Sequence, residues 1–298
     1  MLVDFVQALV DGVTLGATYA LLGLGFTLIF GVLRRLNLAF GSTILVGIYA
    51  GSHLWAAWGA ARPGVLPGVF PAVLLATVGG AVLAGAYVER LSFRALAHQA
   101  PVVSMISSFA VSMQLQELVA LTTPTRTMAY PAPAWLPAVA LGPILLRSDA
   151  FLMWAGATAL LLVLFGLLYR TRPGRAIRAM ADSPETASLM GVNVPVMGAL
   201  AFLVASAVGG VGGALIAASH QQVTPYFGLW ATVKGLTAML LGGAGSLPGA
   251  VVGGLLLGVV ETESLWLLGG QFRDLAAYAL LFLVAAVSPA PRRGTDDV

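Results

Sequence analysis

The chain has 298 residues, of which 59% are hydrophobic and only 9% charged, with a mean hydropathy of +0.93 and a formal net charge of +3. Soluble domains carry about 25% charged residues, so this composition excludes a soluble protein and indicates an integral membrane protein. The chain contains no cysteine, which excludes disulfide bonds and thiolate metal sites.

Apolar segments of about 20 residues, the length that a spanning helix needs, follow one another along the chain. The predicted spans are 5–33, 38–58, 65–88, 102–121, 151–169, 196–218 and 275–287. Two shorter apolar pieces, 229–241 and 250–260, flank the turn sequence GGAGSLPG and form either two short spans or one re-entrant hairpin. The sequence therefore predicts one all-α membrane domain over 1–298, with about eight or nine transmembrane helices and short or broken helices near 229–260.

The basic residues of the short loops predict the orientation of the bundle, because cytoplasmic loops are enriched in Lys and Arg. With the 171–195 loop inside, ten of the 15 basic residues lie on the inner face, four lie on the outer face, and Lys234 lies within a short span. This arrangement predicts an external amino terminus and a cytoplasmic tail at 290–298.

A loop at 122–149 is the longest on the predicted outer face and contains five prolines. So many residues with a restricted φ angle favour an ordered cap on the surface. The cap is either a rigid connector or a docking face for an external partner.

The 171–195 loop is the one long polar run in the sequence. The residues from Arg175 to Met180 can form a helix. Pro184 suits the first turn of a second short helix, capped by Ser183 or Asp182. Glu185 would lie where the helix dipole favours a carboxylate, and Gly191 would end the helix.

This second helix would present the apolar pair Leu189 and Met190 to the cytoplasm. Exposed apolar pairs of this kind mark contact surfaces. The alternative is that the pair enters the headgroup region while the arginines bind anionic lipid.

Ionisable residues within spans are functional candidates, because charge is costly in a bilayer. Glu117 and Gln114 lie toward the outer end of the fourth span, Lys234 lies in a short span, and Glu261 ends another. Glu117 and Lys234 would suit the two charges of an amino-acid zwitterion. Interfacial snorkelling or a salt bridge between helices explains them as well.

Several kinds of chemistry find no support in the sequence. No stretch matches the glycine-rich loop G-x-x-x-x-G-K-[ST] that binds ATP phosphates. No His or acidic cluster has the spacing of a metal site, and no Ser-His-Asp set can be assembled. The chain is therefore predicted to be no enzyme and to bind no cofactor.

Three segments resemble the permeases of ATP-driven branched-chain amino-acid importers. The loop residues Glu185, Ala187 and Gly191 match the "EAA" loop pattern of importer permeases. The segment Gly12–Gly41, GVTLGATYALLGLGFTLIFGVLRRLNLAFG, is similar to the family's first span, although Phe40 stands where the family often has His. The segment Val233–Glu261, VKGLTAMLLGGAGSLPGAVVGGLLLGVVE, is similar to its late signature.

The resemblance implies that separate cytoplasmic ATPases bind ATP and push on the 182–191 helix. It also implies a second related permease, or a second copy of this chain, an external solute-binding protein, and a multi-pass location in a bacterial or archaeal plasma membrane. The residues expected to couple to the ATPases are Arg175, Arg178, Asp182, Glu185, Ala187, Leu189, Met190 and Gly191. The residues expected along the translocation path are Asn37, Gln114, Glu117, Lys234, Gly242, Gly243 and Glu261.

Two alternatives remain open at the level of the sequence. Within the same family the solute could be urea, an amide or another small polar molecule. A different class of protein, an ATP-independent secondary transporter or channel, would need a buried charge relay or ion site.

Overall fold

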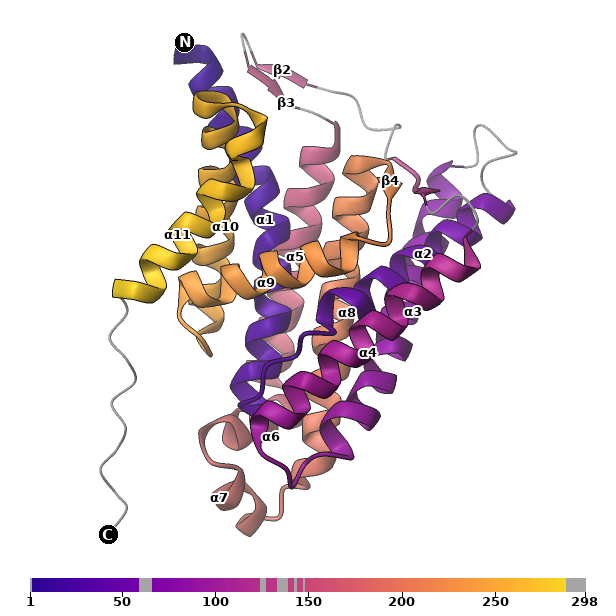
Figure 1. Ribbon diagram of the computed structural model, residues 1–298, viewed down its shortest axis with the longest axis vertical. Coiled ribbons are helices and arrows are strands. Elements are labelled where there is room, and N and C mark those ends of the chain that lie inside the picture. The colour runs from indigo at the N-terminus through magenta and orange to yellow at the C-terminus, as the bar shows by residue number, and fades with distance from the viewer. Residues whose placement is uncertain are drawn as a thin grey trace.

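The computed structural model describes residues 2–58, 66–123, 127–132, 139–141, 144–146 and 148–287. These residues form a bundle that is almost wholly helical (Figure 1), as the sequence predicts. The α-helices are α1 (Leu2–Leu33), α2 (Phe40–Trp58), α3 (Leu66–Val88), α4 (Pro101–Thr122), α5 (Ser148–Arg170), α6 (Arg172–Asp182), α7 (Pro184–Leu189), α8 (Val194–His220), α9 (Phe227–Gly242), α10 (Leu247–Leu268) and α11 (Arg273–Val287). A π-helical turn, η1 (Glu89–Arg94), extends α3, and a 3₁₀ turn, η2 (Gly270–Phe272), precedes α11.

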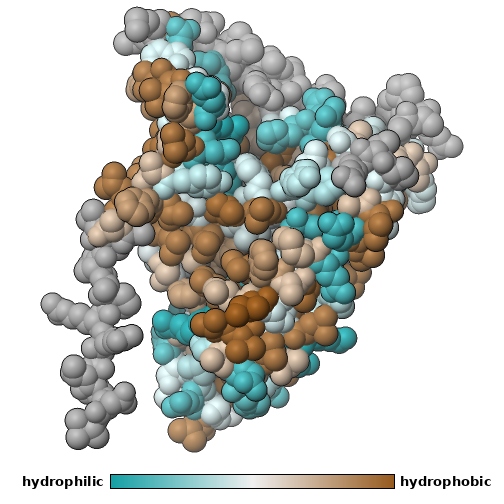
Figure 2. Space-filling view, in the orientation of Figure 1, coloured by the Kyte–Doolittle hydropathy of each residue, from teal (hydrophilic) through white to brown (hydrophobic). Residues whose placement is uncertain are grey.

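Six helices in the described part of the chain are long and apolar enough to cross a membrane: α1, α3, α4, α5, α8 and α10. The shorter helices α2, α9 and α11 complete the nine predicted apolar segments. The prediction of a short piece at 250–260 is wrong, because α10 has 22 residues. Figure 2 shows apolar side chains over the middle of one face and hydrophilic ones toward both ends.

Polar caps followed by proline decide where the chain turns. The side chains of Thr171, Ser183, Asn193 and Ser246 each accept a hydrogen bond from a backbone N–H three residues later. A proline occupies the first turn of each helix that follows. These caps satisfy N–H groups that a helix start leaves free, so the boundaries of α6, α7, α8 and α10 follow from local chemistry.

Helices α1 and α10 cross with almost no side chains between them. A Cβ atom added to Gly16 would lie 2.7 Å from the Cα atom of Leu255, and one added to Gly258 would lie 2.3 Å from the backbone nitrogen of Gly16. Gly12 and Gly254 are as tightly placed. Small residues allow this close approach, which replaces the hydrophobic effect as the source of helix association in lipid.

The two ends of the bundle differ in what they carry. Figure 1 shows the amino terminus and the strands at one end and α6 and α7 at the other. At the first end β1 (Met128–Ala129) pairs with β4 (Gln222–Val223), and β2 (Val139–Leu141) forms a hairpin with β3 (Ile144–Leu146). Much of the predicted proline-rich cap and all of the 290–298 tail lie outside the described residues.

Tyr130 fastens the strand end of the bundle to α3. Its hydroxyl lies 2.9 Å from the Oγ1 atom of Thr77. Burial raises the pKa of Tyr130 to about 12, so the phenol stays protonated and available for this hydrogen bond.

Helix α9 and the start of α10 form a hairpin. Gly242 and Gly249 pack backbone against backbone, and Gly243 and Gly245 take positive φ angles in the turn between them. In Figure 1, α9 crosses the bundle obliquely, and the turn that follows it lines a cavity together with α5 and α6. Helix α10 has the length and composition of a membrane span, so a single re-entrant hairpin, one of the two forms that the sequence allows, does not account for it.

Candidate functional site

Helix α6 is attached to the bundle by its apolar face. Ile177 and Met180 are buried, and Gly174 lies so close to α5 that an added Cβ atom would be 2.1 Å from the carbonyl oxygen of Leu167. The helix is longer than the predicted Arg175–Met180 core and begins directly after α5. It is therefore packed directly on the end of α5.

Two arginines reinforce this attachment. The Arg178 side chain donates through Nε to the carbonyl oxygen of Leu168 at 3.1 Å, and its guanidinium lies 4.4 Å from the centre of the Tyr169 ring. Arg34, at the end of α1, donates to the carbonyl oxygen of Ala181 at 3.0 Å. Both contacts use cations at the carbonyl-rich ends of helices, where the dipole favours them.

Helix α7 has six residues and is fixed at both ends. Ser183 caps its start, as predicted, and Glu185 lies in its first turn. At its end Gly191 takes a φ of +83°, and the N–H of Val192 donates to the carbonyl oxygen of Ala187 at 3.1 Å. This is the left-handed glycine termination that the sequence predicts.

The eight predicted coupling residues divide into two groups. Leu189 and Met190 are 88% and 77% exposed. The other exposed members are Arg175, Asp182, Glu185 and Gly191. Ala187, on the inward face of α7, is buried, and Arg178 of α6 is half-buried against Tyr169. These two residues therefore hold α6 and α7 in position. The solvent-exposed surface of α7 thus consists of the apolar pair Leu189 and Met190 with charged residues nearby.

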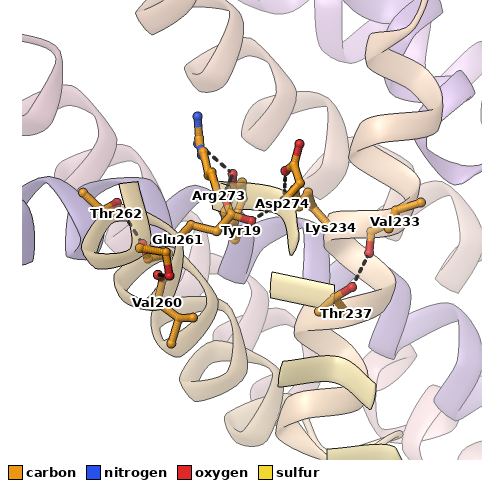
Figure 3. A network of polar contacts seen from close by, with 11 residues as sticks. Tyr19, Val233, Lys234, Thr237, Val260, Glu261, Thr262, Arg273 and Asp274 are labelled. Atoms are coloured by element: carbon orange, nitrogen blue, oxygen red, sulfur yellow. Dashed lines mark hydrogen bonds and ion pairs between the residues drawn. The ribbon is translucent and has the colours of Figure 1, made fainter. Parts of the chain in front are cut away.

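A second cluster of charges lies within the bundle (Figure 3). Lys234 on α9 forms an ion pair with Glu261 on α10, and its Nζ atom lies 2.8 Å from Oδ1 of Asp274 on α11. The other carboxylate oxygen of Glu261 accepts from Tyr19 at 2.8 Å and from Nε of Arg273 at 3.2 Å. We call Tyr19, Lys234, Glu261, Arg273 and Asp274 the charge cluster.

The charge cluster is electrically balanced, with two cations and two anions. Lys234 and Glu261 are fully buried, so each needs its partners to offset the loss of water. The cluster joins α1, α9, α10 and α11. A salt bridge between helices was one of the explanations that the sequence left open for Lys234. Sequence reasoning missed Tyr19, Arg273 and Asp274, although the adjacent charges of Arg273 and Asp274 at the start of the last apolar segment were a visible signal.

Glu117 and Gln114 lie elsewhere, on the exposed side of α4. Gln114 accepts a hydrogen bond from the Tyr87 hydroxyl at 3.0 Å, and Glu117 lines a hollow of about 210 Å³ with Thr224 and Tyr226. The structure records no contact between Glu117 and Lys234 among the described residues. The two residues suggested for the charges of a zwitterion are therefore not brought together.

The other residues predicted along the translocation path lie just before α2 and in the turn between α9 and α10. Asn37 is buried before α2, where its Oδ1 atom accepts from the N–H of Ala39 at 3.0 Å. Its Nδ2 atom has no hydrogen-bond partner in the described part of the chain. Gly242 and Gly243 form the start of the turn after α9. The role of these residues in a path stays a prediction.

Comparison with known proteins identifies relatives over nearly the whole length. The family model described as "Branched-chain amino acid transport system / permease component" matches residues 8–285. The high-affinity branched-chain amino acid transport system permease protein LivH of Salmonella typhimurium is 33% identical over 304 residues, covering 99% of this chain and 97% of LivH. The corresponding protein BraD of Pseudomonas aeruginosa is 31% identical over 303 residues, with the same coverage.

A solved structure shares the fold. A chain of the PsaBC complex from Streptococcus pneumoniae, bound to a Fab, aligns with a TM-score of 0.52 over 97% of each chain, at 14% sequence identity. At this identity the likeness concerns only the helical architecture.

Proposed function

The chain belongs to the branched-chain amino acid transport system permease family, and from this premise we propose that it imports branched-chain or related amino acids with energy from separate ATPase subunits. As a member of this family the chain is an ABC transporter permease and a multi-pass membrane protein, not an enzyme. The proposal concerns its solute, its partners and the residues that couple them.

The exposed surface of α7 is the observation that carries the proposal. Leu189 and Met190 project from a helix whose two ends are fixed, so a partner that binds them can push on the whole element. The push would pass from α7 to α6, and from α6 to α5 and α1 through the Arg178–Leu168 and Arg34–Ala181 contacts. Burying these two exposed apolar side chains against a partner would remove apolar surface from water and so favour binding.

The solute would cross a path completed by a second permease or a second copy, after delivery by an external binding protein. We place Asn37, Gln114, Glu117, Gly242 and Gly243 along this path. Lys234 and Glu261 satisfy each other, so they would shape the wall of the path instead of binding the solute. Most of the selectivity would then reside in the binding protein.

Reconstitution tests the proposal directly. We expect the chain, placed in liposomes with its ATPases and its binding protein, to take up leucine only when ATP is present on the ATPase side. Uptake by the chain alone would support a secondary transporter and contradict the proposal. Uptake of urea or an amide in place of leucine would keep the mechanism and change the solute.

A double substitution tests the docking surface. Leu189→Ser with Met190→Ser should weaken binding of the ATPases by roughly tenfold or more, because two apolar anchors are lost. The measurement is the amount of ATPase that co-purifies from detergent. Leu83→Ser is the matched control, since Leu83 is 74% exposed but lies on α3, away from this surface. Equal loss in the two variants would contradict the assignment.

A further inference from the structure

A cavity of about 370 Å³ lies beside α6 and shares Arg178 and Asp182 with the predicted coupling residues. Its walls come from α1, α5, α6 and the α9–α10 turn. Pockets that bind small molecules start at about this size and combine apolar walls with a few polar groups. The cavity therefore has the dimensions of a small-ligand site beside the coupling element.

Charged groups of both signs line this cavity. Arg178 and Asp182 lie one turn apart on α6, and both border the opening. The Arg178 guanidinium is oriented by the Leu168 carbonyl and the Tyr169 ring, which leaves donors for an anion. Within the described part of the chain Asp182 forms no ion pair.

A buried hydroxyl in the same cavity lacks a partner. The Thr27 side chain is 1% exposed, and its Oγ1 atom makes no hydrogen bond to any described residue. A buried polar atom without a partner costs free energy, and such atoms call for an explanation such as an unseen ligand. A ligand with polar groups would satisfy Thr27.

Aliphatic side chains form another part of the wall. Leu28, Ile177 and Leu247 line it from α1, α6 and the start of α10. An anion-binding Arg, an acidic partner for a cation, a free hydroxyl and an aliphatic wall together suit a small zwitterion with an apolar side chain.

We propose that this cavity binds a neutral aliphatic amino acid from the cytoplasmic side and thereby slows import. A ligand held between α6 and the α9–α10 turn would oppose any movement of α6 relative to that turn. Transport that requires this movement would fall as the internal concentration of amino acid rises. The choice of ligand rests on the proposed function, whereas the zwitterionic chemistry rests on the cavity.

The test uses the complete transporter in liposomes, with ATP inside and the loaded binding protein outside. The initial rate of leucine uptake is measured at increasing concentrations of internal leucine. We expect the rate to fall several-fold, within the 5- to 150-fold range typical of coupling between sites. Internal leucinamide, which lacks the carboxylate, and internal isocaproate, which lacks the ammonium group, should inhibit less.

Two variants of α1 change the cavity without touching the coupling residues. Gly31→Leu should fill the cavity, since a Cβ atom there would meet only Gly245, at 3.8 Å. We expect it to abolish inhibition by internal leucine and to leave uptake into leucine-free liposomes intact. Thr27→Val, which removes the unpartnered hydroxyl, should weaken the inhibition. Gly166→Leu on α5 is the control, because a Cβ atom at Gly166 meets nothing within 4 Å and Gly166 does not line the cavity.

Each contrary result is distinct. Wild-type uptake that ignores internal leucine overturns the inference and leaves the proposed function standing, whereas no ATP-dependent uptake at all refutes the proposed function. Loss of uptake in Gly31→Leu, with or without internal leucine, would mean that the cavity is part of the transport path. Inhibition that follows the phosphatidylethanolamine content of the liposomes, and not internal leucine, would identify a lipid headgroup as the zwitterion.

Discussion

Glu261 is the residue on which the charge cluster is centred, because it accepts from Lys234, Arg273 and Tyr19 inside the bundle. The sequence suggested that a short span ends at Glu261, but α10 continues to Leu268. A charge that would terminate a span in lipid is tolerated once neighbouring helices supply its partners.

Removing one charged residue of the charge cluster should lower the stability of the fold more than removing an oppositely charged pair. Lys234→Met takes away one of the cations that offset Glu261, and breaking a buried pair costs about 3–5 kcal/mol. We expect a clear fall in the thermal stability of the purified protein in detergent.

Two further variants serve as controls for this prediction. Lys234→Met combined with Glu261→Gln should recover part of the loss, since no buried charge is left without compensation. Asp274→Asn should cost less, because the Asp274 side chain is 58% exposed. Equal losses in all three variants would contradict the buried-pair explanation.

At the residue scale, the sequence shows which charged residues lie within apolar segments but not which residues form hydrogen bonds or ion pairs with them. Lys234 and Glu261 stand out in apolar segments, whereas Tyr19 is an ordinary aromatic residue until the fold brings it beside Glu261, 242 positions away. The orphaned hydroxyl of Thr27 was invisible for the same reason, since a missing partner can be recognised only in the folded chain.

Helix α7 depends on a single backbone conformation at its end. Gly191 has a φ of +83° and no atom within 4 Å of an added Cβ, so a substitution there is opposed by backbone strain and not by crowding. A residue other than Gly in this conformation costs roughly 1–2 kcal/mol, and Asn tolerates it best.

We therefore expect Gly191→Val to reduce ATP-dependent uptake strongly and Gly191→Asn to retain most of it. Both uptake and ATP hydrolysis should be measured, because a displaced α7 would leave hydrolysis less affected than transport. Gly79→Val on α3 provides the control, since that position is also open but helical. Equal activity of the Val and Asn variants would argue against a conformational role for Gly191.

At the scale of elements, local signals predicted α6 and α7 well and α10 poorly. Ser183, Pro184 and Gly191 act within a few residues, so their effect can be recognised without the fold. The length of α10 depends instead on contacts with α1 and α9, where Gly253, Gly254 and Gly258 are packing positions inside a continuous helix.

At the scale of the whole molecule, the amino terminus lies at the end of the bundle opposite α7. Figure 1 shows the amino terminus at the end away from α7, in agreement with the alternation of predicted spans. The orientation of this axis in the membrane rests on the distribution of arginines and is a prediction.

The absence of native cysteine makes that orientation easy to measure. Val3→Cys, at the exposed amino-terminal end, should react with a membrane-impermeant thiol reagent in intact cells. Ser188→Cys, exposed on α7, should react only after the membrane is opened. The reverse pattern would place α7 outside the cell and contradict coupling to cytoplasmic ATPases.

The glycine crossing of α1 and α10 bears on how any transport cycle can work. The backbones of these two helices are in direct contact, with no intervening side chains that could change rotamer as the helices slide. We therefore expect α1 and α10 to behave as one rigid unit. We therefore expect alternating access to arise from other helices that rotate relative to α1 and α10. The distance between a spectroscopic label on α1 and one on α10 should stay constant through the transport cycle. The distance from either of these labels to a label on α6 should change.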